Sequence, residues 1–208
     1  MGDQTLLDFD IIYEAKRKGL LVPFDERQLK GASYDIRAGD QAIVVRSEQE
    51  GGYHRVSLKD EEFIDIAPGE TAVIYSLERL GIPATMKGRL SLRSFWAIKG
   101  LYYNGGVVDP GYTGLLFFNV TNLGSGLIHI AYGEGLVTAE FIRLDQPSQK
   151  IYNDGIAAFD VSDSKLPPIP QHAPASLSAL SARVDELAAR IGKLEQRGDD
   201  RSTEPNQG

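Results

Sequence analysis

The sequence predicts a mainly β domain, built as a sandwich, jelly roll or distorted barrel, with a short helix before it and a coiled-coil helix after it. Beyond Leu20, short apolar runs rich in Val, Ile, Tyr and Phe are separated every several residues by Gly, Pro, Asn and Asp. With 208 residues and 42% hydrophobic content, the chain can bury one sizeable core. Many short strands with little helix favour these architectures over a parallel α/β sheet.

The individual elements follow from local patterns. The first is an amphipathic helix with Asp8 as its N-cap and Gly19 as its end. Its apolar residues recur at helical spacing: Leu7, Ile11, Ile12 and Ala15. The clearest strands are QAIVVR from 41, TAVIYSL from 71, GLLFFNVTN from 114, GLIHIAY from 126 and LVTAEFIRL from 136.

A change in composition marks the end of the domain. Prolines cluster between 167 and 174, where neither a sheet nor a helix can continue. We therefore expect a folded domain over 1–162, a Pro-rich linker over 163–176, a coiled-coil helix over 177–197 and a disordered polar tail over 198–208.

The helix after the linker carries a heptad seam with alternating spacings of three and four residues. Its members are Leu177, Leu180, Val184, Leu187, Ile191 and Leu194. The alternative is an amphipathic helix lying on its own domain, but the preceding linker favours self-association. Val and Ile at one seam position with Leu at the other favour two strands, and so short a coil would reinforce a homo-oligomer formed elsewhere.

Composition also limits the function. The net charge of −7 disfavours binding to a nucleic-acid backbone. The chain has no cysteine, and His54, His129 and His172 show no metal-ligand spacing. The charged start has no secretory signal, and no stretch is long and apolar enough to span a membrane, so we expect a cytoplasmic protein.

The stretch from Ile82 to Gly124 is the most informative for function. Asp109 lies in an Asp-Pro-Gly-Tyr turn after Gly-Gly-Val-Val, where its carboxylate could activate a water or accept a hydrogen bond from a sugar hydroxyl. The same residues also suit a plain hairpin turn. Arg93 and Ser94 could bind a phosphate, or could simply lie on a surface strand or turn. A packing role for Trp96 is favoured over base stacking.

The motifs in chain order are Pro23-Phe24, GASYDIRAG from Gly31, Ile82-Pro83, Gly88-Arg89-Leu90, RSFWAIKGL from Arg93, VVDPGY from Val107, and Asn122. This ordered set, spanning roughly residues 6 to 145, resembles the dCTP deaminases and the related dUTPases. The resemblance implies a dUTPase-like distorted β-barrel or jelly roll. It also implies a trimer with sites shared between subunits, and Mg²⁺ bound mainly through the phosphates of dCTP or dUTP.

The resemblance assigns roles to particular residues. Arg93 and Ser94 would face the triphosphate or reacting centre, Asp109 the deoxyribose and water, and the ring of Tyr112 the sugar. Asp35 would support the core or a subunit contact. The candidate catalytic residues are Asp109, Ser94 and Arg93. The candidate substrate-binding residues are Arg93, Ser94, Lys99, Gly106, Val107, Asp109, Tyr112 and Asn119.

The chain departs from both enzyme patterns. Asn119 stands where the deaminases have the Glu that moves protons, and an amide cannot act as a general base. Phe95 and Ile98 replace a Ser and an Arg of the deaminase motif, whereas Ala97 and Lys99 resemble the dUTPase version. Compared with the dUTPase pattern, Thr138 replaces a Gln, and no glycine-rich arm that would close over the phosphates is recognisable after Tyr152.

Two main hypotheses follow. The first is an enzyme acting on dCTP or dUTP. Asn119 then favours diphosphate hydrolysis over deamination, although the N-terminal half resembles the deaminases more closely. The second is a catalytically inactive deoxynucleotide-binding, scaffold or regulatory protein. A ligand-free structural β assembly is the third and least favoured. Glu134 and Glu140 lie near the motifs, but their strand faces cannot be assigned from sequence.

Overall fold

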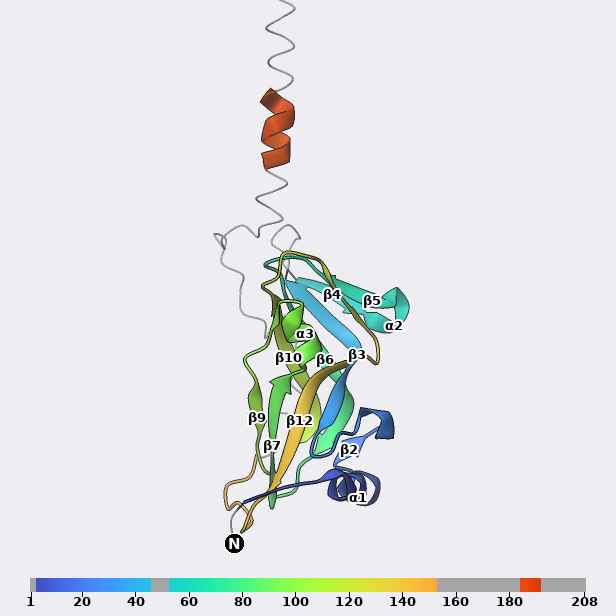
Figure 1. Cartoon of the computed structure of the whole chain (residues 1–208), viewed down its shortest axis with the longest axis vertical. Helices are drawn as coiled ribbons and strands as arrows, with labels where there is room; N and C mark the ends of the chain where they lie inside the picture. Colours follow the sequence, from blue (N-terminus) through green and yellow to red (C-terminus); the bar gives the residue numbers. More distant parts are fainter. Residues whose placement is uncertain (1–2, 46–52, 153–183, 192–208) are drawn as a thin grey trace, which may run out of the picture.

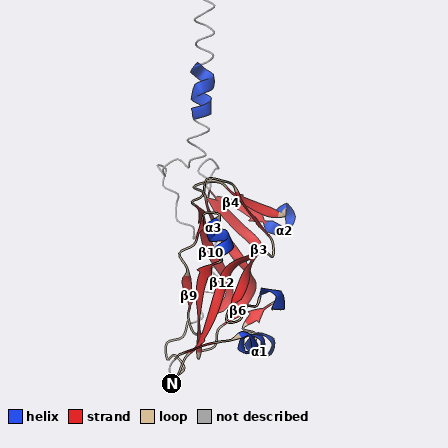
Figure 2. Ribbon diagram, in the orientation of Figure 1, coloured by secondary structure: helices blue, strands red, loops and turns tan. Residues whose placement is uncertain are grey.

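The computed structural model describes residues 3–45, 53–152 and 184–191 of the chain (Figure 1). Strands dominate the fold, and the helices are short (Figure 2). The first half of the domain contains β1 (Gln4–Thr5), α1 (Asp8–Lys18), β2 (Leu21–Val22), the 3-10 turn η1 (Glu26–Gln28), β3 (Tyr34–Val45), β4 (Tyr53–Ser57), α2 (Leu58–Glu61), β5 (Phe63–Ile66) and β6 (Thr71–Gly81). The second half contains β7 (Met86–Leu92), α3 (Ser94–Ile98), β8 (Leu101–Tyr102), β9 (Gly106–Val108), β10 (Thr113–Asn122), β11 (Ile128–Ala131) and β12 (Gly135–Arg143).

The main sheet is antiparallel, and its longest path runs β8-β10-β6-β3-β12-β7-β9. Strands β8 and β9 form the two ends of this path, yet only residues 103–105 separate them in the chain. So short a link spans at most about 14 Å. The two ends of the sheet must therefore lie close together, and the sheet curls into a distorted barrel. This architecture confirms the predicted mainly β fold.

The interior of the barrel is filled by alternate residues of the long strands. On β6, for example, every second residue from Ala72 to Leu80 is buried, while Val73, Tyr75, Leu77 and Arg79 between them are half-buried or exposed. The largest fully buried side chains include Trp96, Tyr34, Phe118 and Phe141. This alternation explains why the runs recognised in the sequence form strands.

Helix α1 and strand β2 lie at one end of the barrel, whereas α2, β4 and β5 lie at the other (Figure 1). The predicted N-cap was wrong by one residue, because Leu7 has extended backbone angles and is the N-cap, and Asp8 is the first helical residue. Leu7 is also exposed, and Leu6 is buried in its place. Gly19 ends the helix in the left-handed conformation, as expected, with φ of 72°.

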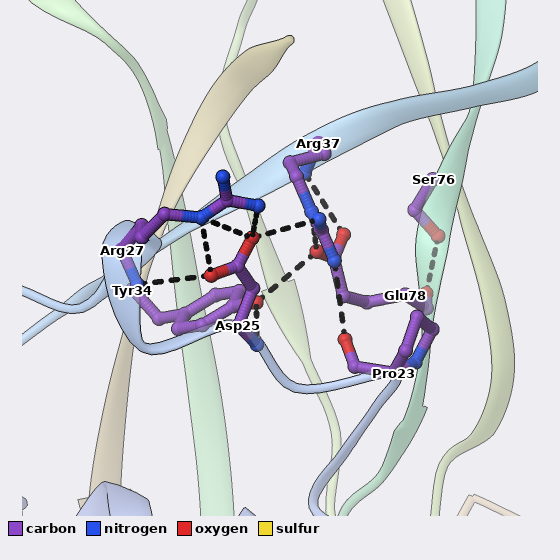
Figure 3. Close-up of polar contacts among 7 residues, drawn as sticks. All are labelled: Pro23, Asp25, Arg27, Tyr34, Arg37, Ser76 and Glu78. Atoms are coloured by element: carbon purple, nitrogen blue, oxygen red, sulfur yellow. Dashed lines mark hydrogen bonds and ion pairs between the residues drawn. The ribbon is translucent and has the colours of Figure 1, made fainter. Parts of the chain in front are cut away.

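A buried ionic network ties the segment after β2 to strands β3 and β6 (Figure 3). Glu78 of β6 is fully buried, and its carboxylate accepts hydrogen bonds from Arg37 N at 2.9 Å, Arg37 Nε at 2.5 Å and the Tyr34 hydroxyl at 3.2 Å. Arg37 also donates to Asp25 Oδ2 at 3.1 Å and to the Pro23 carbonyl at 3.3 Å. Burial of these charges is tolerated because each one is paired.

The C-terminal predictions are only partly covered by the described residues. The helix over 184–191 falls within the predicted coil. The linker over 163–176, the tail over 198–208 and the rest of the coil lie outside the described residues. In the part of the chain that the structure describes, no helix is both long and apolar enough to cross a membrane.

Candidate functional site

The turn at residues 109–112 joins two arms, residues 104–108 with β9 and residues 113–122 with β10, whose strands are not paired with each other. Strand β9 pairs with β7, and β10 pairs with β6 and, at its far end, with β8. Among the described backbone hydrogen bonds, the arms share only the one from Tyr112 N to Asp109 O at the turn. We call the line between β9 and β10 the seam of the barrel. Backbone donors and acceptors along it are not used to join the two strands.

The turn at one end of the seam carries Asp109 and Tyr112. Asp109 is exposed, and its carbonyl accepts the turn hydrogen bond at 3.2 Å. Gly111 has φ of 88°, and a Cβ there would lie 2.8 Å from the Ile151 Cβ, so the turn needs glycine for both conformation and space. Residues 109–112 therefore form a turn, as expected, but its flanking strands do not pair as a hairpin; the Asp109 side chain is exposed to solvent.

Tyr112 packs beside this turn. Its hydroxyl donates to the Leu115 carbonyl, and its ring lies 5.2 Å from the ring of Tyr152. Burial raises the pKa of Tyr112, and the neighbouring Tyr152 raises it further. The raised pKa favours the neutral phenol, which donates to Leu115 of β10. Gly106 and Val107, the other predicted residues of this arm, are exposed on β9.

Asn119 lies on the outward face of β10, and it is exposed. Tyr102 pairs with Thr121, so by residue count Asn104 is the position opposite Asn119 across the seam. The arms remain close here, because the rings of Tyr103 and Phe118 pack at 5.9 Å. Asn104 is also exposed, and sequence inspection missed it because the strand register, not a motif, places it opposite Asn119.

A second group of predicted residues lies where β7 ends. Arg93 Nε is 2.9 Å from Asp35 Oδ2, and Arg93 Nη1 donates to the Gly135 carbonyl at 2.7 Å. Thr138 Oγ1 donates to Asp35 Oδ1 at 2.8 Å, and Lys30 Nζ lies 3.8 Å from the same carboxylate. Asp35 is thus buried and paired, which fits the core-supporting role that the resemblance implies.

Helix α3 begins directly after Arg93. Ser94, its first residue, is exposed, whereas Trp96 is fully buried and donates from Nε1 to the Gly135 carbonyl at 2.8 Å. The packing role expected for Trp96 is what the structure has. Lys99 Nζ lies 4.1 Å from the centre of the Phe95 ring and 5.0 Å from that of Trp96, a cation–π arrangement.

The two groups do not meet within one chain. Val108, next to Asp109, pairs with Gly88, and Arg93 is five residues further along β7. At about 3.3 Å per residue, the Asp109 turn and Arg93 are separated by roughly 17 Å along the strand. The structure therefore places Asp109 and Tyr112 at one end, Arg93, Ser94 and Lys99 at the other, and Gly106 and Val107 on β9 between them.

Glu134, Glu140 and His129, the other polar residues considered from the sequence and described in the structure, lie outside these two groups. Glu134 Oε2 accepts a hydrogen bond from Ala131 N at 3.2 Å, and Glu140 of β12 lies opposite Arg89 of β7 in the backbone register. His129 is bonded to Asp65, whereas His172 lies outside the described residues. Among the described residues, no three or more His, Asp or Glu side chains are grouped so as to hold a metal ion. A Mg²⁺ ion bound mainly through substrate phosphates does not require such a group.

Comparison with known proteins identifies the family. The dCTP deaminase-like family model matches residues 8–143. The chain is 32% identical over 140 residues to the dCTP deaminase of Thermococcus kodakarensis, covering 67% of this chain and 86% of that one. It is 26% identical over 137 residues to the dUMP-forming dCTP deaminase of Aquifex aeolicus, covering 63% and 76% of the two chains.

A solved structure agrees on the fold. The dCTP deaminase of Agrobacterium tumefaciens superposes with a TM-score of 0.59 at 21% identity. The match covers 69% of this chain and 49% of that one. The curled antiparallel sheet, the ordered motifs and the extent of the match lead to one conclusion: the chain belongs to the dCTP deaminase-like family.

Proposed function

We propose that the protein binds a deoxypyrimidine triphosphate along the seam and hydrolyses it to the monophosphate and pyrophosphate. The observation that carries the proposal is the unpaired seam, with Asp109 in the turn at one end and with Asn119 of β10 opposite Asn104, which precedes β9, further along. Proteins similar to this chain are named dCTP deaminases, including a dUMP-forming one. Their names support a deoxypyrimidine nucleotide as the ligand.

The base would be recognised by the two amides. An Asn side chain offers both donors and an acceptor, and backbone groups along the seam offer the same. Because an amide can turn either end towards its partner, it can match cytosine or uracil. Asn104 and Asn119 are therefore expected to bind the base edge of either nucleotide, with neither charge nor metal involved.

Asp109 would act at the phosphate. Its carboxylate takes a proton from a water whose oxygen attacks the α-phosphorus, the bond from that phosphorus to the bridging oxygen of the β-phosphate breaks, and pyrophosphate leaves. Bound with the nucleotide, Mg²⁺ would neutralise phosphate charge. Hydrolysis is favoured over deamination because deamination requires proton transfer at the base, and the amide of Asn119 cannot perform it.

We further propose that the site is completed by another copy of the chain. The separation of roughly 17 Å between Arg93 and the Asp109 turn, estimated along β7, is too long for one phosphate to contact both. A neighbouring copy in a trimer would supply its Arg93 and Ser94 to the triphosphate. Arg93 makes two bonds to protein groups, through Nε and Nη1, and its side chain is 30% exposed, so Nη2 can reach a ligand.

The proposal is tested with purified protein, dCTP, dUTP and Mg²⁺, with products separated by anion-exchange chromatography. Wild-type protein should release dUMP and pyrophosphate from dUTP, and Asp109→Asn should lower the rate by about 10² to 10⁴-fold. The variant exchanges one exposed turn residue for another and should keep the melting temperature. Deamination of dCTP by the wild-type protein would overturn the assignment made for Asn119.

A catalytically inactive nucleotide-binding protein is the second candidate. It is favoured by Asn119 in place of the deaminase Glu and by the guanidinium of Arg93, which is largely engaged by Asp35 and Gly135. This candidate predicts a nucleotide-dependent rise in melting temperature with no product from either triphosphate. If neither binding nor turnover occurred, both functions would be rejected.

A further inference from the structure

Lys30 is a second cation beside the buried carboxylate of Asp35. It begins the tight turn over residues 30–33 that leads into β3, where its backbone N donates to the Ser33 carbonyl at 2.8 Å. On either side of this turn, Leu29 pairs with Tyr34. The backbone of Lys30 is therefore held in place. Its Nζ lies 3.8 Å from Asp35 Oδ2, and 54% of the side chain is exposed.

The buried carboxylate is already bonded without Lys30. Arg93 Nε lies 2.9 Å from Asp35 Oδ2, and Thr138 Oγ1 donates to Asp35 Oδ1 at 2.8 Å. The contact of Lys30 is longer than a charge-assisted hydrogen bond of about 2.7–2.9 Å, and its amine donates no hydrogen bond within the described part of the chain. Because Arg93 and Asp35 offset each other in charge, Lys30 supplies the excess positive charge of these three side chains.

We propose that Lys30 is a phosphate-binding residue, which contacts the β- or γ-phosphate of the nucleotide together with Arg93 and Ser94 of the same copy. Lys30 Nζ and Arg93 Nε approach one oxygen of Asp35, so they are at most about 7 Å apart. At that separation, charge-assisted hydrogen bonds of about 2.7–2.9 Å can join both side chains to one phosphate or to two adjacent ones. Ser94 follows Arg93 directly and is exposed. The inference rests on the nucleotide binding of the proposed function.

The alternative is that Lys30 only stabilises Asp35. A half-exposed lysine at 3.8 Å is a weak contributor to folding, because solvent screens the attraction and the flexible side chain loses entropy when it is held. The shorter contacts from Arg93 and Thr138 would remain after its removal. Loss of the Lys30 amine should therefore leave the fold intact and weaken only ligands that carry the β- and γ-phosphates.

The test uses the full-length protein, Mg²⁺ and analogues of dUTP and dCTP in which nitrogen bridges the α- and β-phosphorus, so that the proposed reaction cannot cleave them. Binding is measured by isothermal titration calorimetry. Lys30→Gln should raise the Kd of the bound triphosphate analogue about tenfold, the scale of one lost hydrogen bond to a charged group. It should leave the Kd of the matching monophosphate unchanged. Lys30→Arg keeps the charge and should restore most of the affinity.

Lys18→Gln is the matched control. The Lys18 side chain is 55% exposed and donates to the buried Glu14 at 3.1 Å, so the variant removes the same charge beside another carboxylate, on α1. It should leave the Kd of every ligand unchanged. Both Gln variants should keep the melting temperature of the wild-type protein. An equal loss of affinity in the two variants would overturn the role of Lys30, because general charge would then explain it.

The remaining outcomes separate this inference from the proposed function. If the wild-type protein binds neither analogue, nucleotide binding is rejected, and the role of Lys30 with it. If the wild-type protein binds an analogue and Lys30→Gln binds it equally well, only the role of Lys30 is rejected. Equal weakening of the triphosphate analogue and the monophosphate would also overturn it, because the loss would then arise from the structure around Asp35.

Discussion

Removal of Glu78 should destabilise the domain more than any exposed substitution. Glu78→Ala deletes the acceptor of three hydrogen bonds from Arg37 and Tyr34 and leaves Arg37, whose side chain is only 11% exposed, short of a counter-charge. Breaking one side of a buried ion pair typically costs about 3–5 kcal/mol. Asp25 and the Pro23 carbonyl still bind Arg37, so the lower end, about 3 kcal/mol, is expected.

The assay is urea unfolding followed by intrinsic fluorescence, together with thermal melting. At about 2–4 °C per kcal/mol for a chain of this size, the melting temperature should fall by roughly 6–12 °C. Glu26→Ala is the control, because Glu26 is 61% exposed and pairs with Lys16 in solvent, where loss should stay below about 1 kcal/mol. A loss below about 1 kcal/mol for Glu78→Ala would refute the reasoning that the network stabilises the fold.

Three further predictions test the turn, the core and the acid response. Hydrogen bonds from Arg27 lower the pKa of Asp25 to about 2 from the ordinary 3.8, so its contribution to stability is complete above pH 4 and is lost between about pH 4 and 2. Asp25→Asn should flatten the pH dependence of unfolding in that window. Gly111→Ala should cost about 1–2 kcal/mol in denaturant titrations, whereas Gly126→Ala, where a Cβ meets no atom within 4 Å, should not. Trp96→Phe should cost about 1–3 kcal/mol in the same titrations, through a lost hydrogen bond and a cavity.

Sequence reasoning found the strands whose signals are local. The runs beginning at 71, 114 and 136 became β6, β10 and β12, because alternate residues of each face the core. The strand predicted from Thr71 ended at Leu77, whereas β6 continues to Gly81. The reason is Glu78, whose charge argues against a buried strand until Arg37, 41 residues earlier in the chain, neutralises it.

The same limit applies to the candidate site. The motif residues were found in sequence, but their division into two groups depends on which strand pairs with β9. Only the β7 pairing shows that Arg93 lies at the far end from Asp109. Likewise, only the register of β8 against β10 shows that Asn104 lies opposite Asn119. Pairings between distant segments are set by the packed core, and no local sequence pattern predicts them.

The residues proposed to decide the reaction contribute little to the fold. Asp109, Ser94 and Asn119 are all exposed, and exposed substitutions usually change stability by no more than about 0.5 kcal/mol. The core and turn residues therefore determine the fold that the family shares. Substitutions at a few exposed positions can change the chemistry without cost to folding. Asn119→Glu tests this separation: it should leave the melting temperature unchanged and, if the base lies along the seam, should introduce release of ammonia from dCTP, measured by a coupled ammonia assay. A variant that melts normally but never deaminates would mean that the base does not reach β10 at this position.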